Sequence, residues 1–100
     1  MRLLAKRTRI QIYVDILRAI HMMNRRGARI SLYAVERASG LPYSRLTTHL
    51  SKLRAAGLVE NGLGITLKGY EFLEDIVGKV APLLAKYDLW NESGTVQQEE

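Results

Sequence analysis

The chain has 100 residues, 47% of them hydrophobic and 25% charged, which is typical of one small globular domain and excludes a disordered or fibrous protein. Its formal charge is +5 and it contains no cysteine, so disulfide bonds, thiolate metal sites and cysteine nucleophiles are excluded. No apolar run approaches the roughly 18 residues of a membrane span, and charged residues follow Met1 too early for a signal peptide. We therefore expect an intracellular protein that has no membrane partner.

The first predicted helix covers residues 9–24. Thr8 and Gln11 stand three residues apart, the spacing at which a hydroxyl and an amide satisfy backbone donors at a helix start. Gly27, which follows two arginines, marks the end of the helix. The apolar residues between them recur every three or four positions and so share one face: Tyr13, Ile16, Leu17, Ile20 and Met23. Residues 1–7 form a separate basic arm.

A second and a third helix follow, joined by a tight turn. Residues 28–30 could add a short strand to a sheet, after which Ser31 can cap a helix of about eight residues that Gly40 stops. Pro42 lies in the turn, since proline is tolerated at the entry to a helix. The third helix is predicted over residues 43–56, with one apolar stripe toward the core, made of Leu46, Leu50 and Leu53.

A small β-hairpin is predicted next. Residues 58–60 and 65–67 are short segments of strand type. They flank Asn61 and Gly62, a strong signal for a two-residue hairpin turn.

The last predicted helix covers residues 67–90, and Thr66 can cap it. Its apolar residues form a heptad-like seam roughly 36 Å long at 1.5 Å per residue, made of Leu73, Ile76, Val80, Leu83, Tyr87 and Trp90. Pro82 removes one helical hydrogen bond, so we expect a bend or a break near residues 78–82. Residues 91–100 are polar and lack periodicity, which indicates a flexible tail.

The face of the third helix opposite its leucines is small, polar and cationic. Helical geometry turns these residues outward: Ser44, Thr48, Ser51 and Ala55, flanked by Arg45, Thr47 and Lys52. Such a helix fits a major groove about 12 Å wide, where arginine is the commonest reader of guanine, so we assign Arg45 to base reading. An ordinary solvated face is the alternative, and the turn before this helix and the hairpin after it favour DNA.

The sequence resembles the winged helix-turn-helix superfamily of DNA-binding proteins through residues 31–60. Within them, Thr48-His-Leu-Ser-Lys-Leu-Arg-Ala-Ala-Gly-Leu-Val59 is similar to the end of a recognition helix and the first strand of the hairpin that this family calls the wing. Ile65-Thr-Leu-Lys-Gly69 is similar to the exit from the wing. The likeness covers about residues 8–90 and is greatest to small archaeal proteins that dimerise through an antiparallel coiled coil of their last helix.

This resemblance implies a mainly α fold with a small β-hairpin, a winged helix-turn-helix DNA-binding domain over residues 8–66 and a dimerisation helix over residues 67–90. It assigns the seam to a homodimer interface. The chain departs from the family pattern at Pro42, where related helices often place a Ser or Thr cap, and at Pro82 within the seam. With the basic arm included, the residues expected at DNA are Tyr43, Ser44, Arg45, Thr47, Thr48, Ser51, Lys52, Arg7 and Arg9.

Charge is distributed unevenly along the chain. Residues 1–59 hold twelve lysines and arginines against two acidic residues, a formal charge of +10, whereas residues 60–100 carry −5. Such a gradient indicates that the first part meets a polyanion. Arg25, Arg26 and Arg29 belong to this excess, but cations at the end of a helix also favour its dipole, so their contact with phosphate stays open.

We therefore expect a homodimeric transcriptional regulator that binds double-stranded DNA in the cytoplasm, on the nucleoid. A sequence-tolerant chromatin protein and a winged-helix module that docks other proteins are the alternatives. No nucleophile and base stand at catalytic spacing, so an enzyme is not expected. His21 and His49 lack ligand companions at metal spacing, so neither a metal nor a cofactor is expected, and a small-molecule effector is unknown.

Overall fold

The computed structural model describes residues 8–27 and 29–90 of the chain. In chain order the elements are α1 (Arg9–Arg26), α2 (Leu32–Ser39), α3 (Tyr43–Ala55), α4 (Leu67–Asp75), the π-helix η1 (Ile76–Val80) and α5 (Ala81–Ala85). The predicted basic arm, which contains Arg7, and the predicted tail lie outside the described residues.

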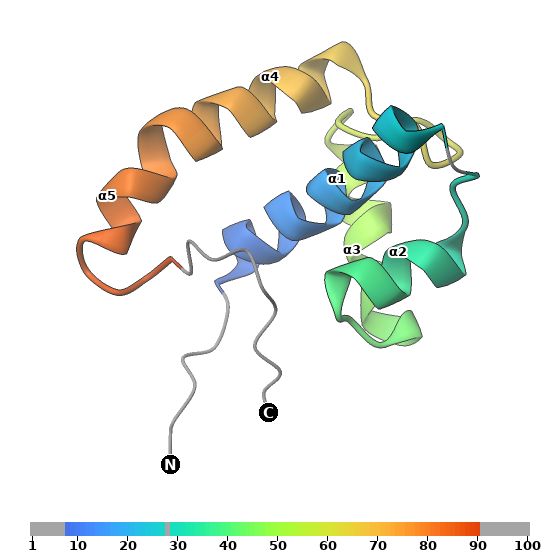
Figure 1. Cartoon of the computed structure of the whole chain (residues 1–100), viewed down its shortest axis with the longest axis horizontal. Helices are drawn as coiled ribbons and strands as arrows, with labels where there is room; N and C mark the ends of the chain where they lie inside the picture. Colours follow the sequence, from blue (N-terminus) through green and yellow to red (C-terminus); the bar gives the residue numbers. More distant parts are fainter. Residues whose placement is uncertain (1–7, 28, 91–100) are drawn as a thin grey trace.

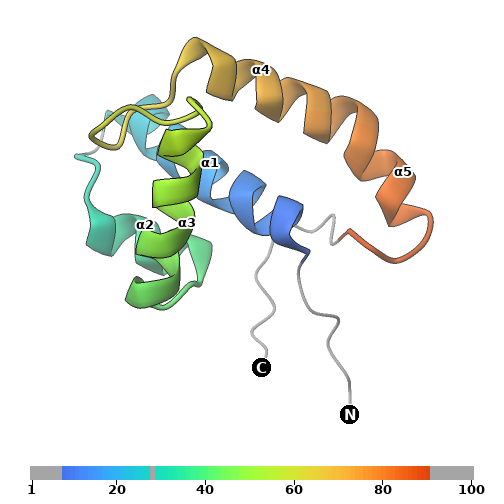
Figure 2. The same cartoon turned by 180° about the vertical axis from the view of Figure 1, so that it is seen from behind.

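The central element is α1. It packs against α2 and α3 on one side and against α4 on the other, and α4 continues through η1 into α5 (Figure 1). The view from behind shows α3 beside α2, across α1 from α4 (Figure 2). The largest fully buried side chains come from the first three helices: Val14, Ile16, Leu17, Ile20, Val35, Ser39, Leu46, Leu50 and Leu53. Ala81 of α5 is fully buried as well. The core therefore holds α3 by one face only.

The first three predicted helices are present, and the first two are capped by the side chains expected from the sequence. Thr8 Oγ1 accepts a hydrogen bond from Gln11 N at 3.1 Å, and Ser31 Oγ accepts one from Ala34 N at 3.1 Å. After α2, Gly40 has a φ of 73°, a left-handed conformation that closes the helix at low steric cost. The strand expected at residues 28–30 is not seen at residues 29 and 30, because the described chain has no strand with which they could pair.

The predicted β-hairpin is not formed as two strands. One antiparallel bridge joins Val59 and Ile65, and Glu60 N donates to Gly64 O at 2.8 Å. We name residues 59–65 the wing loop. Its turn is longer than the two-residue turn that Asn61 and Gly62 predict. No second strand extends beyond the bridge because α4 begins at residue 67, where the hairpin prediction required a strand.

The side chain of Arg54 replaces part of the missing ladder. Its Nε donates to Glu60 O at 3.1 Å and its Nη2 donates to Gly62 O at 2.8 Å. Two backbone carbonyls of the wing loop are thus bonded to a guanidinium from α3 rather than to a partner strand. Lys68 on α4 donates from Nζ to Ala56 O at 3.1 Å, so a second cation fastens the end of α3 to the start of α4.

The predicted last helix is interrupted and shorter than expected. Five residues of π-helix separate α4 from α5, and Ala81 N donates to Ile76 O, five residues back. Pro82 explains the change, because it has no N–H for the carbonyl of residue 78 and its ring crowds the preceding turn. The bend predicted near residues 78–82 is confirmed, but α5 ends at Ala85 instead of residue 90.

The chain turns back after α5. Leu89 N donates to Leu84 O at 2.9 Å and Asp88 has a φ of 61°, so the backbone reverses there. Trp90 then returns to the core, where only 6% of it is exposed. Leu73 is also buried in the same core. The predicted seam from residue 73 to residue 90 is therefore not one continuous exposed stripe, because its two ends are covered by the chain itself.

Candidate nucleic-acid interface

The outer face of α3 carries most of the residues predicted to contact DNA. Leu46, Leu50 and Leu53 are at most 2% exposed, so the orientation of the helix about its own axis is fixed. The residues that point away from the leucines are exposed to solvent, as predicted: Ser44, Arg45, Thr48, Ser51 and Lys52. Thr47 is half-buried at the edge of this face. Tyr43 lies on the leucine side of the helix but is also exposed, because it is in the first turn. These seven residues form the surface that we name the α3 outer face.

The threonine hydroxyls on the α3 outer face are already engaged as donors. Thr47 Oγ1 and Thr48 Oγ1 each donate to Ser44 O at 3.0 Å. A hydroxyl that donates inward retains its lone pairs as acceptors. Thr48 can therefore present a methyl group and an acceptor oxygen to a groove, which suits a thymine methyl or the amino group of adenine or cytosine.

The first turn of α3 has no side-chain cap. Its N-cap residue is Pro42, and the first helical hydrogen bond runs from Leu46 N to Pro42 O at 2.9 Å. The N–H groups of residues 43–45 precede that bond and have no acceptor within the helix. Because this end of the helix dipole is positive, these donors are suited to an anion such as a phosphate. Because Pro42 supplies no side-chain cap, the backbone N–H groups of residues 43–45 remain available to a ligand.

The wing loop contributes structure more than charge. Arg54 keeps its charge, but its Nε and Nη2 donors are directed at the carbonyl oxygens of Glu60 and Gly62 and not at solvent. Sequence reasoning missed this role, and no local motif points to it, because the partners lie six and eight residues away. Asn61 and Gly62 are exposed, so the tip offers backbone groups to a ligand.

Arg9 is the predicted DNA contact that lies away from the α3 outer face. It is exposed in the first turn of α1. Both views show that turn apart from α3, between α3 and α5 (Figures 1 and 2). The structure therefore does not bring Arg9 together with the seven residues of the α3 outer face.

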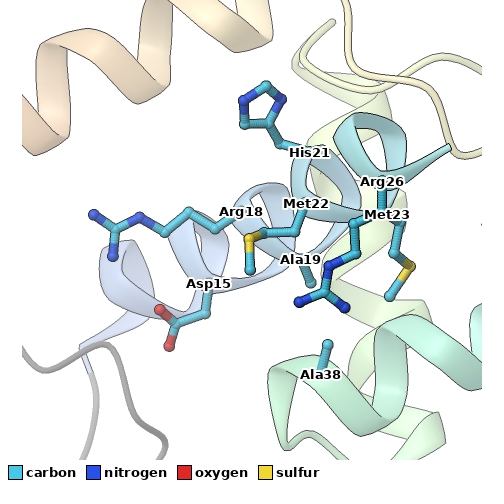
Figure 3. A pocket seen from close by; sticks show the side chains of 8 residues that line it. All are labelled: Asp15, Arg18, Ala19, His21, Met22, Met23, Arg26 and Ala38. Carbon is cyan, nitrogen blue, oxygen red and sulfur yellow. The ribbon is translucent and has the colours of Figure 1, made fainter. Parts of the chain in front are cut away.

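A cavity of about 470 Å³ lies beside α1, next to α2. It is lined by Asp15, Arg18, Ala19, His21, Met22, Met23, Arg26 and Ala38 (Figure 3). The Arg26 side chain extends from α1 toward α2 in this view. None of the residues of the α3 outer face lines the cavity, so it is separate from that surface.

The exposed side of α2 holds a pair that sequence reasoning also missed. Arg37 Nη1 donates to the Tyr33 hydroxyl at 3.1 Å, and the guanidinium carbon lies 5.7 Å from the centre of the Tyr33 ring. The hydrogen bond to Tyr33 raises the pKa of Arg37 above its ordinary value. The spacing of four residues places the two side chains on one face of a helix, and this is the signal in the sequence that points to the pair.

A model of the winged helix-turn-helix family matches residues 6–79. The chain belongs to the winged helix-turn-helix family. No curated protein and no solved structure gives a significant match. In this winged-helix protein, α2, the turn and α3 are the helix-turn-helix unit, and the match extends through α4 into η1. Membership of the family supports a DNA-binding domain.

No described helix of the winged-helix protein is long and apolar enough to cross a membrane. His49 is half-buried and packs edge-on against Tyr13, with 5.4 Å between ring centres. His21 makes a similar contact with Tyr70 at 5.3 Å. Both histidines are thus partly accounted for by aromatic packing.

Proposed function

We propose that this winged-helix protein is a transcriptional regulator that binds double-stranded DNA as a homodimer, with α3 in the major groove. The observation that carries the proposal is the α3 outer face, which is exposed, polar and cationic on a helix whose other face is buried. A helix held in this way can enter a groove without disturbing the core. The proposal places the protein in the cytoplasm, on the nucleoid.

Within this proposal the residues of α3 have different roles. Arg45 lies in the first turn and reads a base edge, preferably guanine. Thr48 lies one turn further along and contacts a neighbouring base through its methyl group or its acceptor oxygen. Lys52 and the free N–H groups of the first turn bind phosphates on either side, which fixes the position of the helix. Ser44 and Ser51 are small enough to allow close approach.

The homodimer is proposed on the apolar side chains at the other end of the molecule. Leu83 is 55% exposed, Tyr87 65% and Leu89 51%, and all three lie within α5 or the turn that follows it. Ile76 and Val80 of the predicted seam are half-buried. Because Leu73 and Trp90 are covered by the chain itself, the proposed interface is centred on Leu83 and Tyr87 rather than on the whole seam.

The proposal is tested by equilibrium binding to duplex DNA over a range of salt concentrations, after selection of preferred sites from random duplexes. Phosphate contacts make log K fall linearly with log salt, and a homodimer selects a palindrome. Arg45→Ala should weaken binding to the selected site by about 1–3 kcal/mol and relax preference at one base pair in each half-site. Lys79→Ala, which removes an exposed cation on η1, is the matched control and should leave this preference unchanged.

Three other outcomes would change the conclusion. Steep salt dependence without a selected sequence would indicate a chromatin-type protein. Loss of preference in both variants would contradict the role of Arg45. Absence of duplex binding even at low salt would overturn the DNA-binding function and leave a module that docks other proteins, for which the polar α3 outer face gives little support.

A further inference from the structure

Tyr33 and Arg37 form a bonded pair on the exposed side of α2. They stand four residues apart, so their side chains leave the helix on the same face. A 3.1 Å hydrogen bond and a cation–π contact, with 5.7 Å from the guanidinium carbon to the ring centre, direct the guanidinium toward Tyr33. Tyr33 is nonetheless 65% exposed, and Arg37 is exposed as well. Two large side chains are therefore ordered by each other at a surface that the core does not cover.

The pair has hydrogen-bond donors that no anion of the described chain accepts. A guanidinium has five N–H donors, and Arg37 uses one of them on Tyr33. The Tyr33 hydroxyl accepts that bond, which leaves its own hydrogen free to donate. No carboxylate of the described residues makes an ion pair with Arg37. An anion that met both side chains would accept a charge-assisted bond from Arg37 and a second bond from Tyr33.

The place of the pair in the fold indicates which anion this is. A short turn, residues 40–42, joins α2 to α3, and the two helices pack together. When the second helix of such a unit enters a major groove, the first crosses the phosphate backbone beside it. The face of α2 opposite the buried Val35 carries Tyr33 and Arg37, so these side chains are free to reach a phosphate.

We propose that Tyr33 and Arg37 together bind one phosphate of the DNA backbone beside the groove that α3 enters. This inference rests on the proposed DNA-binding function. It extends the contact surface from one helix to two and separates their tasks. The α3 outer face selects the sequence, and the Tyr33–Arg37 pair fixes the position of the helix-turn-helix unit along the duplex.

The alternative role of the pair is helix stabilisation. An exposed pair at this spacing stabilises a helix only slightly. Moreover, α2 is already capped by Ser31 and closed by Gly40, and Val35 and Ser39 anchor it in the core. A purely structural pair would affect the unfolding of α2 and would have no effect on the salt dependence of DNA binding, which gives the two roles different signatures.

The test compares Arg37→Gln, Tyr33→Phe and the control Lys79→Gln with the unchanged protein, on a selected duplex and on an unrelated one. Removing one phosphate contact from B-DNA lowers the slope of log K against log salt by about 0.9 for each subunit bound. Arg37→Gln should show this loss, by the same amount on both duplexes, and should leave the selected sequence unchanged. Lys79→Gln should keep the original slope.

Tyr33→Phe distinguishes the pair from a lone cation. It keeps the charge of Arg37, so the slope should remain close to that of the unchanged protein, while affinity for both duplexes falls about three- to tenfold with the lost hydrogen bonds. Because both side chains are exposed, the variants should keep the melting temperature within a few degrees, which circular dichroism checks.

If the slope of log K against log salt were unchanged in Arg37→Gln, the inference would be overturned. The proposed function would still stand, provided that the unchanged protein binds duplex DNA. An unchanged slope would then favour a contact of the pair with another protein. A change in the selected sequence would also overturn the inference, since a phosphate contact carries no base preference. If the unchanged protein failed to bind duplex DNA, both this inference and the proposed function would fall.

Discussion

Gly69 allows α4 to pass close to the wing loop. A Cβ atom at this position would collide with Leu58 O and would lie 2.6 Å from Ile65 Cγ2. Leu58 O is also the acceptor of the backbone hydrogen bond from Thr66, at 3.1 Å, so it cannot move without loosening the start of α4. The glycine in Ile65-Thr-Leu-Lys-Gly69 is therefore required by packing, and not by backbone conformation.

Gly69→Ala should destabilise the protein. The added methyl group forces apart a backbone carbonyl and a core side chain, a kind of overpacking that costs about 1–3 kcal/mol. Urea unfolding followed by circular dichroism measures the change in the free energy of unfolding.

Gly78→Ala is the matched control for Gly69→Ala. Gly78 lies in η1, and apart from its chain neighbours and the backbone of its own helix, no atom lies within 4 Å of the position that a Cβ atom would take there. Alanine should therefore be neutral or stabilising by up to about 1 kcal/mol at this position. Equal losses of stability in the two variants would show that the close approach at Gly69 is not what makes a side chain costly there.

Arg54 shows how one residue can replace regular secondary structure. In a hairpin, the carbonyls of residues 60 and 62 would be available to a partner strand or to water. Here both accept from the guanidinium of Arg54. Two of its nitrogens are engaged within the chain, so we expect Arg54 to make no direct contact with phosphate.

Arg54→Gln should loosen the wing loop without changing the salt slope of DNA binding. The wing loop loses the guanidinium that bonds two of its carbonyl oxygens. The amide hydrogen of Glu60, which donates to Gly64 O, should therefore exchange with solvent faster. Arg54→Lys keeps the charge but lacks the planar guanidinium that bonds two carbonyl oxygens at once, so we expect faster exchange of the Glu60 amide in this variant too. A reduced salt slope in Arg54→Gln alone would mean that Arg54 contacts phosphate instead.

At the scale of elements, the parts that the sequence predicts well are those specified by neighbouring residues. The cap at Thr8, the left-handed closure at Gly40 and the leucine stripe of α3 each depend on residues within about one turn of helix. The exposed α3 outer face follows from that stripe, so most of the candidate site is predictable. The same local logic at Pro82 correctly predicts a bend.

Other features depend on contacts between distant residues. The turn of the wing loop is longer than predicted, and its carbonyl oxygens accept hydrogen bonds from Arg54. The Asn61-Gly62 dipeptide cannot reveal this contact, because Arg54 lies outside the turn. The end of α5 depends on the return of Trp90 to a core formed mainly by the first three helices. Periodicity alone assigns Trp90 to an exposed seam, because spacing shows which residues share a face but not what covers it.

The whole molecule separates two kinds of surface. The helix-turn-helix unit lies on one side of α1, with the cations Arg37, Arg45 and Lys52 exposed. The exposed apolar residues of α5 and the following turn lie at the far end (Figures 1 and 2). A second copy that covered this end would leave both α3 outer faces free, so dimerisation and DNA binding need not compete.

Leu83→Glu should therefore convert a dimer into a monomer. The 55% exposed leucine would meet its symmetry mate or a neighbouring apolar side chain in the interface, and a carboxylate there would be desolvated without a partner. Sedimentation equilibrium should give twice the 11.3 kDa chain mass for the unchanged protein and the chain mass for the variant.

Leu67→Glu provides the control, because Leu67 is 75% exposed but begins α4, far from α5 along the chain, and a carboxylate in the first turn of a helix is tolerated. This variant should remain a dimer. Loss of the dimer should also weaken binding to a palindrome far more than binding to a single half-site, because only the former uses two helix-turn-helix units. If Leu83→Glu remained dimeric, or if the unchanged protein were monomeric, the apolar end would be excluded as the dimer interface. The proposed role of the α3 outer face in DNA binding would not be affected by either result.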